Sequence, residues 1–320
     1  MAVYTRLSTE EIKQHLLNYK IGELIEYTEI IEGIDNSNFI LETTSGKFIL
    51  TVFESRIKKD ELPFFINFKS HLAKKGICCP KPLENNSGNI ISDLKGKKSC
   101  IVTFLKGSNL KSFEGYQDNI TDKHCFEVGK ILAQLHQASM GFESSRFNDL
   151  GNTVWKEFFA KFKKLTQEYQ KNLQLEIEDN ISFLKENWVS NLPSCPSHLD
   201  LFPDNVFFDD KSEVSGVIDF YFAANDLVIY DFAIAVNAWC FDKDNNFIET
   251  RFDKMLAGYE SVRKFSLEEK NFLTIACLGA AMRFLLTRLH DMFFTPKDSI
   301  VNIKNPQEYL AKLRFFRSKL

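Results

Sequence analysis

Short runs of apolar residues, broken by turn residues, dominate the first third of the chain. Residues 39–43 and 48–53 form two such runs, and Ser45-Gly46-Lys47 between them is typical of a tight turn. Residues 100–105 form a further apolar run. The pattern therefore predicts three β-strands in this part, two of them joined directly by the turn.

Apolar residues three or four positions apart mark the helices. The spacing of Leu62, Phe65, Phe68 and Leu72 predicts a helix that Gly76 ends, and Thr9-Glu10-Glu11 is typical of a helix start near the N-terminus. After residue 110 the pattern becomes mainly helical, as in the set Val128, Ile131, Leu132 and Leu135. The longest apolar stretch, residues 272–282, is shorter than the ~20 residues of a membrane span and predicts a buried core helix.

The order of these elements predicts the fold class. Strands come first and helices follow, with a glycine-containing linker at residues 106–110, so we expect an α+β protein with two lobes. Residues 1–105 would form a small β-rich N-lobe that binds a nucleotide. Residues 111–320 would form a larger, mainly helical C-lobe for catalysis and substrate binding. Ligand sites favour the cleft between such lobes.

Composition narrows the class of protein. The 320 residues carry a net charge of -3 and no long Lys/Arg run, which argues against a nucleic-acid partner. The seven cysteines include no C-x-x-C pair, which argues against a zinc site, and their odd number is typical of reduced thiols. The N-terminus lacks the features of a signal peptide. We therefore expect a cytoplasmic protein with no membrane partner; the composition selects no oligomeric state.

One short strand-rich island, residues 196–222, interrupts the helical part and holds the candidate chemistry. The polar run Asp209–Ser212 predicts a turn between two short strands. Asn205 precedes the first strand and Asp219 ends the second, so an antiparallel hairpin would bring their side chains together. Such oxygen ligands suit Mg²⁺ that bridges nucleotide phosphates. Asp200 lies on the loop that enters the hairpin, where a carboxylate can accept a proton from a substrate hydroxyl.

Ordinary structural roles compete with each of these interpretations. Aspartates such as Asp200 commonly cap turns, and Asp219 could cap a helix. His198 is expected to hold the loop through its ring rather than to act in catalysis, because one base is enough. Asp231, twelve residues after Asp219 (231 − 219), could accept hydrogen bonds from the loop backbone or serve as a helix N-cap.

The spacing His198-x-Asp200-x-x-x-x-Asn205 followed by Asp219 resembles the aminoglycoside/choline kinase-like phosphotransferases, a branch of the protein-kinase-like fold. The resemblance implies ATP and Mg²⁺ as cofactors, Asp200 as catalytic base, and Asn205 and Asp219 as metal ligands. Residues 32–39, 48–54, 256–289 and 309–315 are similar to the homoserine kinases of this superfamily. They imply L-homoserine as substrate and a step of threonine biosynthesis.

The resemblance also implies a nucleotide site in the N-lobe. Asn36, Ser37 and Asn38 fall in the expected N-lobe turn, where backbone N–H groups and short polar side chains can bind phosphate oxygens. A plain hairpin turn would favour the same residue types. Phe104 and Leu105, next to the linker, are expected to contact the nucleotide as well.

One position departs from the usual pattern of the fold. Most of these kinases carry a Lys or Arg in the third strand, which pairs with the nucleotide phosphates. Thr51 stands at the corresponding position here. Lys47, Arg56 or Lys58 could supply the missing cation, and metal coordination could carry more of the charge.

Several alternatives to homoserine stay open at this point. A protein kinase is disfavoured because Leu199 replaces the arginine of H-R-D and Phe220-Tyr221 replaces the end of D-F-G. Choline, methylthioribose or an aminoglycoside are possible substrates of the same fold, and Trp155, Trp188 and Trp239 could form an aromatic cage for choline or simply pack the core. A non-catalytic nucleotide-binding protein is a second class, against which the complete Asp200, Asn205 and Asp219 set argues.

The head group of homoserine needs a cation for its carboxylate and an acceptor for its ammonium group. Arg283 and Arg288 lie on an otherwise apolar helix, where a buried arginine requires an anionic partner. That partner could be the substrate, or a structural aspartate such as Asp291.

Overall fold

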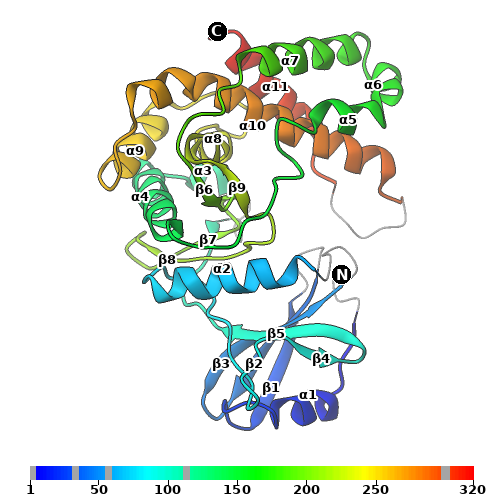
Figure 1. Ribbon diagram of the computed structural model, residues 1–320, viewed down its shortest axis with the longest axis vertical. Coiled ribbons are helices and arrows are strands. Elements are labelled where there is room, and N and C mark those ends of the chain that lie inside the picture. Colours follow the sequence, from blue (N-terminus) through cyan, green and yellow to red (C-terminus); the bar gives the residue numbers. More distant parts are fainter. Residues whose placement is uncertain (1–4, 31–35, 55–59, 111–115, 297–302) are drawn as a thin grey trace. The chain divides into compact units, whose positions relative to one another are not determined.

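The structure is a computed structural model that describes residues 5–30, 36–54, 60–110, 116–296 and 303–320 (Figure 1). The described chain divides into two compact units. The first holds residues up to Lys106 together with Gly216–Tyr221, and the second holds Gly107–Ser215 and Phe222–Leu320. The β-rich first unit and the mainly helical second unit confirm the predicted α+β class. The first boundary falls in the segment predicted as a linker, and the roles assigned to the two parts stay predictions.

A five-stranded antiparallel sheet forms the centre of the first unit. Its strand order is β1-β2-β3-β5-β4, with bounds β1 Leu24–Ile30, β2 Asn36–Thr43, β3 Gly46–Phe53, β4 Ser92–Leu94 and β5 Lys97–Thr103. The predicted hairpin is the β2–β3 pair, in which Thr43 faces Gly46. Gly46 has φ +129°, a value that favours glycine, so the turn forms there.

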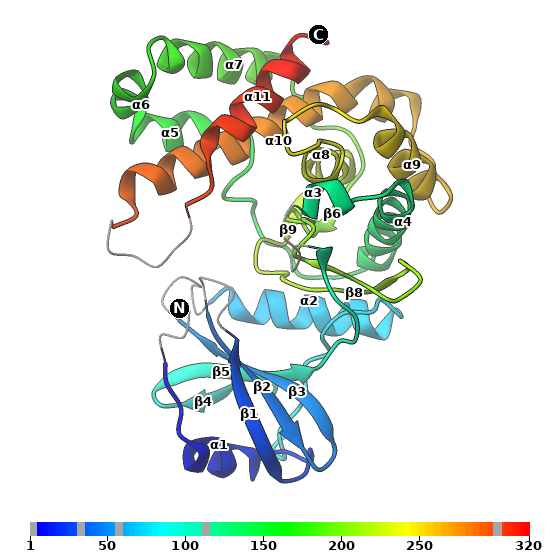
Figure 2. The same ribbon diagram turned by 180° about the vertical axis from the view of Figure 1, so that it is seen from behind.

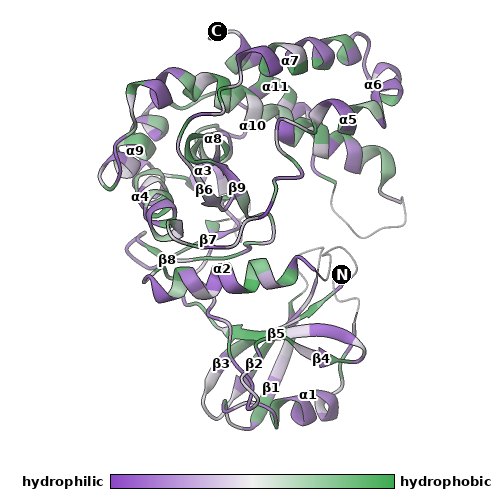
Figure 3. Ribbon diagram, viewed as in Figure 1, coloured by the Kyte–Doolittle hydropathy of each residue, from purple (hydrophilic) through white to green (hydrophobic). Residues whose placement is uncertain are grey.

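Both faces of this sheet are covered. Leu50, Val52 and Ile101 join a core with helix α1 (Thr9–Leu16), whereas Cys100 and Val102 join a second core with helix α2 (Leu62–Lys74). Adjacent residues of β5 thus enter opposite cores, as the period of a strand requires. In Figure 3 helix α2 alternates between green and purple, as expected for a helix with one apolar face.

The segment Gly216–Tyr221 corrects the predicted division of the chain, which placed it inside residues 111–320. It belongs to the first unit because Val217 N donates to Cys78 O at 2.9 Å and because Phe220 packs on Phe68 with ring centroids 6.0 Å apart. Tyr221 packs on Phe65, at 5.7 Å.

The second unit is built from helices around a few short strands (Figure 2). The helices are α3 Tyr116–Asn119, α4 Asp122–Ser139, α5 Trp155–Ala160, α6 Lys163–Tyr169, α7 Leu173–Asn187, α8 Val228–Trp239, α9 Glu249–Glu260, α10 Leu267–Phe294 and α11 Pro306–Arg317. The strands are β6 Ser194–Ser197, β7 Val206–Phe208, β8 Val214–Val217 and β9 Ala224–Leu227, which pair as β6–β9 and β7–β8. Helix α8 is the central element, and most of its residues are buried.

Helix α10 contains the predicted core helix and extends it in both directions. By length and composition alone it could cross a membrane, but 72% of its apolar window is buried inside the protein. Ser266 caps its start, with Glu269 bonding back to the cap. Burial of this kind identifies the core helix of a folded domain, as predicted.

Candidate active site

A buried carboxylate accepts hydrogen bonds from the loop between β6 and β7, which runs from His198 to Asn205. Asp231 on α8 accepts the backbone N–H groups of His198 and Leu199 at 2.9 and 2.8 Å. His136 on α4 bonds the same carboxylate at 3.0 Å. Burial alone would raise the pKa of Asp231, but the bonds from His136 and the loop hold it below its ordinary value. Of the two roles left open for Asp231, the structure shows the backbone acceptor, inside α8 rather than at its cap.

Leu199 gives the loop its sharp bend. Its φ of +59° lies in the left-handed region, which costs an L-residue roughly 1–2 kcal/mol. Two bonds hold it there: its N–H reaches Asp231, and its carbonyl accepts from Arg283 Nη1 at 2.6 Å. The bend sets the direction of the next residue, Asp200, and is therefore part of the site.

Asp200 is half-buried and is tied to Asn205. The amide nitrogen of Asn205 donates to the main-chain oxygen of Asp200 at 2.7 Å and to its carboxylate at 3.2 Å. Burial raises the pKa of the Asp200 carboxyl above its ordinary value, and the positive charge of Arg283 offsets part of that rise. A carboxylate with a raised pKa is a stronger base, as a proton acceptor requires.

His198 has the structural role expected for it. Its side chain is buried, and its ring Nδ1 accepts the backbone N–H of Asp200 at 3.3 Å. Trp239 on α8 adds a further support, because its Nε1 donates to Leu201 O at 2.8 Å. Side chains from α8 and α10 thus bond the loop at His198, Leu199 and Leu201.

The predicted metal ligands lie on either side of the β7–β8 hairpin. The turn is confirmed, because Asp209 N donates to Glu213 O at 3.0 Å and Ser212 N donates to Asp209 O at 2.9 Å. The oxygen of the Asn205 amide accepts no hydrogen bond from any described residue, so it is available to a cation. Asp219 follows β8 in the first unit, with φ +62°, and no described helix begins beside it. Its approach to Asn205 stays a prediction.

Amide and carboxylate oxygens fit a hard divalent cation such as Mg²⁺. Within the described ranges, no group of three or more His, Cys, Asp and Glu side chains forms a metal site. Mg²⁺ is commonly held by one or two protein ligands together with substrate phosphates, so a set of two ligands is compatible with it.

The structure corrects the expected position of Asn36, Ser37 and Asn38. They begin strand β2 and pair with β3 instead of forming a turn, and residues 32–35 lie outside the described ranges. The hydroxyl of Ser37 is fully buried, accepts Thr5 N at 2.9 Å and donates to Glu54 at 2.7 Å. The strand, which the apolar run predicts from residue 39, begins at Asn36 because pairing with β3 extends that far.

Phe104 and Leu105 are the two remaining predicted nucleotide contacts, and they follow β5 in the first unit. Phe104 is partly exposed, whereas Leu105 lies against Gly216, where an added Cβ would come within 2.5 Å of Leu105 Cδ1.

Two of the residues that concern the missing third-strand cation, Lys47 and Thr51, lie in β3. Thr51 lies in β3 and donates to Asn38 at 2.8 Å. Lys47 pairs with Glu42 at 2.9 Å at the start of the strand, and Arg56 and Lys58 lie outside the described residues.

Lys69 on α2 is a cation that the sequence interpretation missed. It is 5% exposed, and its Nζ lies 3.4 Å from the hydroxyl of Tyr221, with no ion pair to any described carboxylate. A lysine among Phe65, Phe68 and Leu72, on the apolar face of a predicted helix, was the available signal.

The two arginines proposed for the substrate head group differ in their surroundings. Arg283 is buried beneath the loop and bonds Leu199. Arg288 pairs with Glu308 on α11 at 2.6 Å, and not with Asp291, which was the suggested structural partner. The tryptophans pack the core: Trp155 and Trp239 are buried, and Trp188 packs on Trp155 at 5.6 Å.

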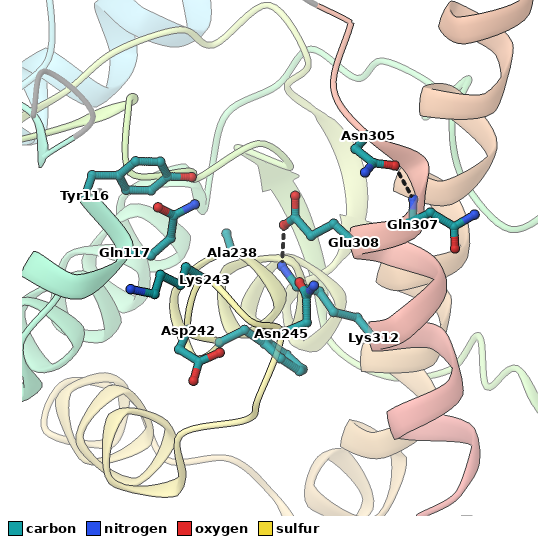
Figure 4. A pocket seen from close by; sticks show the side chains of 11 residues that line it. Tyr116, Gln117, Ala238, Asp242, Lys243, Asn245, Asn305, Gln307, Glu308 and Lys312 are labelled. Carbon is teal, nitrogen blue, oxygen red and sulfur yellow. Dashed lines mark hydrogen bonds and ion pairs between the residues drawn. The ribbon is translucent and has the colours of Figure 1, made fainter. Parts of the chain in front are cut away.

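A pocket of about 220 Å³ lies within the second unit (Figure 4). Residues from α3, from α8 and the loop after it, and from α11 line it: Tyr116, Gln117, Ala238, Phe241, Asp242, Lys243, Asn245, Asn305, Gln307, Glu308 and Lys312. Figure 4 shows Glu308 and Lys312 reaching in from α11, with Tyr116 and Gln117 on the opposite side. The lining is mostly polar, so it suits a hydrophilic ligand.

Comparison with known proteins decides the family. Residues 26–265 match the model of the phosphotransferase enzyme family. The chain belongs to this family. It is 45% identical to a homoserine kinase of Agrobacterium fabrum (strain C58 / ATCC 33970), over 99% of this chain and 96% of that protein. It is 43% identical to a homoserine kinase of Rhizobium meliloti (strain 1021), over 99% and 95% of the two chains.

Solved structures of phosphotransferases share the fold. An amicoumacin kinase in complex with AMP-PNP and Ca²⁺ is similar with a TM-score of 0.71 and 13% identity, over 98% of this chain and 93% of that one. A spectinomycin phosphotransferase in complex with ADP and its antibiotic is similar with a TM-score of 0.69 and 15% identity, over 98% and 95%. The fold and the family predicted from the sequence are thereby confirmed.

Proposed function

We propose that this phosphotransferase is a homoserine kinase, which converts ATP and L-homoserine to ADP and O-phospho-L-homoserine. The observation that carries the proposal is the loop that holds the Asp200 carboxylate, which Asp231 and Arg283 fix by hydrogen bonds. The relatives that match the chain over nearly its full length are homoserine kinases. Cytoplasmic localisation belongs to the same proposal.

Asp200 would accept the proton of the substrate hydroxyl. In the transfer, the hydroxyl oxygen forms a bond to the γ-phosphorus of ATP, the bond from that phosphorus to the β,γ-bridging oxygen breaks, and the proton passes to the carboxylate. The hydrogen bond from Asn205 and the support from Arg283 fix the position of Asp200 before substrate arrives. Fixed position matters because this chemistry asks the protein mainly for positioning and charge stabilisation.

Asn205 and Asp219 would hold Mg²⁺, through the amide oxygen of the first and the carboxylate of the second. When bound, the ion neutralises charge on the phosphates. For the nucleotide, the proposal keeps Asn36, Asn38 and the segment Phe104-Leu105. It omits the side chain of Ser37, because its buried hydroxyl already bonds Glu54 and Thr5.

Substrate choice tests this proposal most directly. Steady-state kcat/KM should be measured for L-homoserine, L-serine, 1,4-butanediol and choline with ATP and Mg²⁺, alongside methylthioribose and an aminoglycoside. Homoserine should be strongly preferred, because analogues without its carboxylate or ammonium leave polar groups unpaired. Serine should react poorly because its hydroxyl is one methylene closer to the head group. A choline value at or above that of homoserine would refute the substrate assignment.

Asp200→Asn tests the base. Fold and ATP binding should remain, while kcat falls by roughly 10²–10⁴-fold, as for removal of a general base. Asp210→Asn is the matched control, since Asp210 is exposed in the neighbouring hairpin turn. Near-native kcat in Asp200→Asn would exclude Asp200 as the base.

A further inference from the structure

Glu308 and Lys312 line the pocket in Figure 4, and Arg288, which is not part of that lining, joins them in a cluster of three charged side chains. Glu308 accepts from Arg288 Nη1 at 2.6 Å and from Lys312 Nζ at 2.6 Å. Arg288 also bonds Asn305 O at 2.9 Å, and Lys312 bonds Asn237 O at 2.8 Å. Arg288 and Lys312 are only 8% and 3% exposed, whereas the Glu308 side chain is 37% exposed and faces the pocket.

The charges of this cluster do not balance. Burial would raise the pKa of Glu308, but Lys312 and Arg288 lower it to about 2, so the carboxylate is ionised at neutral pH. Burial lowers the pKa of Lys312, and the carboxylate of Glu308 opposes that effect. With Lys312 protonated, two cations share one anion, which leaves a formal excess of one positive charge. Buried charge is costly unless it is paired, so this excess favours an anionic ligand.

Bonding capacity remains on both sides of the cluster. Nε and Nη2 of Arg288 donate to no described residue. A carboxylate offers about four acceptor sites, and Glu308 accepts one bond on each of its oxygens. The guanidinium edge formed by Nε and Nη2 of Arg288 can thus bind an anion, while the carboxylate of Glu308 can bind a cation. A zwitterionic ligand requires both contacts.

Packed rings connect this cluster to the loop that holds Asp200. Phe202 of the loop packs on Phe284 of α10 at 4.9 Å, and Phe284 packs on Tyr309 of α11 at 5.1 Å. Tyr309 follows Glu308 in the chain and lies under the guanidinium of Arg288, 4.4 Å from it. Its hydroxyl is buried without a hydrogen-bond partner among the described residues. Burial raises the pKa of Tyr309, and the carboxylates of Glu308 and Asp200 add to the rise.

Tyr116 makes a second connection from the other side of the pocket. Burial raises its pKa to about 12, with the carboxylates of Glu308 and Asp204 adding to the effect. Asp204 directly precedes Asn205 in the loop. The ring contacts of Phe202, Phe284 and Tyr309 connect α11, which lines the pocket, to the candidate catalytic loop within one unit of the protein.

We propose that the cluster of Arg288, Glu308 and Lys312 binds the head group of an L-α-amino acid substrate, with its carboxylate on Arg288 and its ammonium on Glu308. The side-chain hydroxyl would then extend toward Asp200. This inference rests on the proposed function and names the residues that select its substrate. It assigns to Arg288 a specificity role and gives Arg283 no contact with the substrate head group.

Matched pairs of analogues and variants test the two contacts separately. 3-Amino-1-propanol is homoserine without its carboxylate, and 4-hydroxybutyrate is homoserine without its ammonium group. Arg288→Met should raise KM for homoserine roughly 10- to 100-fold, as expected for the loss of a charged hydrogen bond, and should leave KM for 3-amino-1-propanol nearly unchanged. Glu308→Gln should raise KM for homoserine but spare 4-hydroxybutyrate. KM for ATP should change in neither variant.

Arg314→Met is the control. Arg314 lies on α11, as Glu308 does, and makes a bidentate pair with Glu176 at 2.7 Å on the exposed side of the helix. It should leave every KM as in the wild type. Thermal unfolding checks that each variant is folded, and Arg288→Lys and Glu308→Asp serve where the larger changes prevent folding.

The outcomes separate this inference from the proposed function. If the wild type does not phosphorylate homoserine, the proposed function fails. If it does, but the folded variants keep the wild-type KM and the same discrimination among analogues, the head-group site fails. A crystal structure of the wild type with L-homoserine decides the case independently of any variant. A head group away from Glu308 and Arg288 overturns the inference, and one between them supports it.

Discussion

Arg283→Met separates the structural and the functional contributions of a buried arginine. The substitution removes the bond from Nη1 to Leu199 O, made at 2.6 Å by a side chain that is 2% exposed. A hydrogen bond to a charged group contributes roughly 1.5–3 kcal/mol to stability. Arg283 Nε, however, is buried without a hydrogen-bond partner, and such a group costs roughly 1–3 kcal/mol. Because these contributions oppose each other, we expect the free energy of unfolding to change by less than about 2 kcal/mol.

The effect on catalysis should be larger than the effect on stability. Arg283 is the foremost charge that opposes the burial-raised pKa of Asp200, so its removal should raise that pKa further. The base must be deprotonated to act, so the acid limb of the kcat/KM profile should move to higher pH. Each 1.4 kcal/mol of lost attraction corresponds to roughly one pH unit. Release of Leu199 from its left-handed conformation should also lower kcat.

The assay is kcat/KM for homoserine as a function of pH, together with urea unfolding at neutral pH. Arg283→Lys keeps the charge and should return the acid limb toward its wild-type position while kcat stays low, because an ammonium lacks the reach of the guanidinium fork. Arg314→Met on the surface should change neither measurement. An unshifted acid limb in a folded Arg283→Met protein would refute the electrostatic role.

Two further substitutions probe groups that lie away from the substrate. Asp231→Asn should lower the free energy of unfolding at pH 7 by a few kcal/mol, roughly 1–3 for each buried loop N–H whose bond is weakened. The folded pKa of Asp231 is lowered, so its contribution to the free energy of unfolding is complete above the ordinary pKa of about 4. That contribution is lost as the pH falls through the folded pKa. Urea unfolding of the variant should therefore depend less on pH in that acid range than urea unfolding of the wild type. Lys69→Met should leave stability unchanged or higher, because a buried lysine without a carboxylate partner contributes little to it. We expect its KM for ATP to rise roughly 10-fold if Lys69 supplies the cation absent at Thr51, and an unchanged KM would exclude that role.

Local signals explain why much of the fold could be predicted. The β2–β3 hairpin follows from two apolar runs on either side of Ser45-Gly46-Lys47, and the turn at Asp209–Ser212 from a polar run between short apolar segments. The spacing between Asp200 and Asn205 placed both on one loop, where the structure joins them by hydrogen bonds. In each case the signal and the structure involve residues close in sequence.

The errors have a different physical origin. Asn36–Asn38 read as a turn because short polar residues favour turns, yet pairing with β3 extends the strand through them. The segment 216–221 was assigned by sequence order, but Phe220 and Tyr221 pack with the aromatic face of α2. Tertiary pairing and packing override local propensity in both cases, and neither is visible in a single stretch of sequence.

The support of the Asp200 loop shows the same limit at the site itself. Asp231 and Trp239 come from α8, and Arg283 comes from α10, so all three reach the loop from beyond its own hairpin. Arg283 was noticed from its apolar surroundings and assigned to the substrate, because burial predicts that an arginine needs a partner without identifying that partner. The partner is a main-chain carbonyl whose own position depends on the left-handed bend at Leu199. The loop keeps this conformation only where those helices are packed around it, because their side chains supply its bonds. The geometry of the candidate base therefore depends on the core of the second unit, and core substitutions in α8 or α10 should alter kcat without touching substrate.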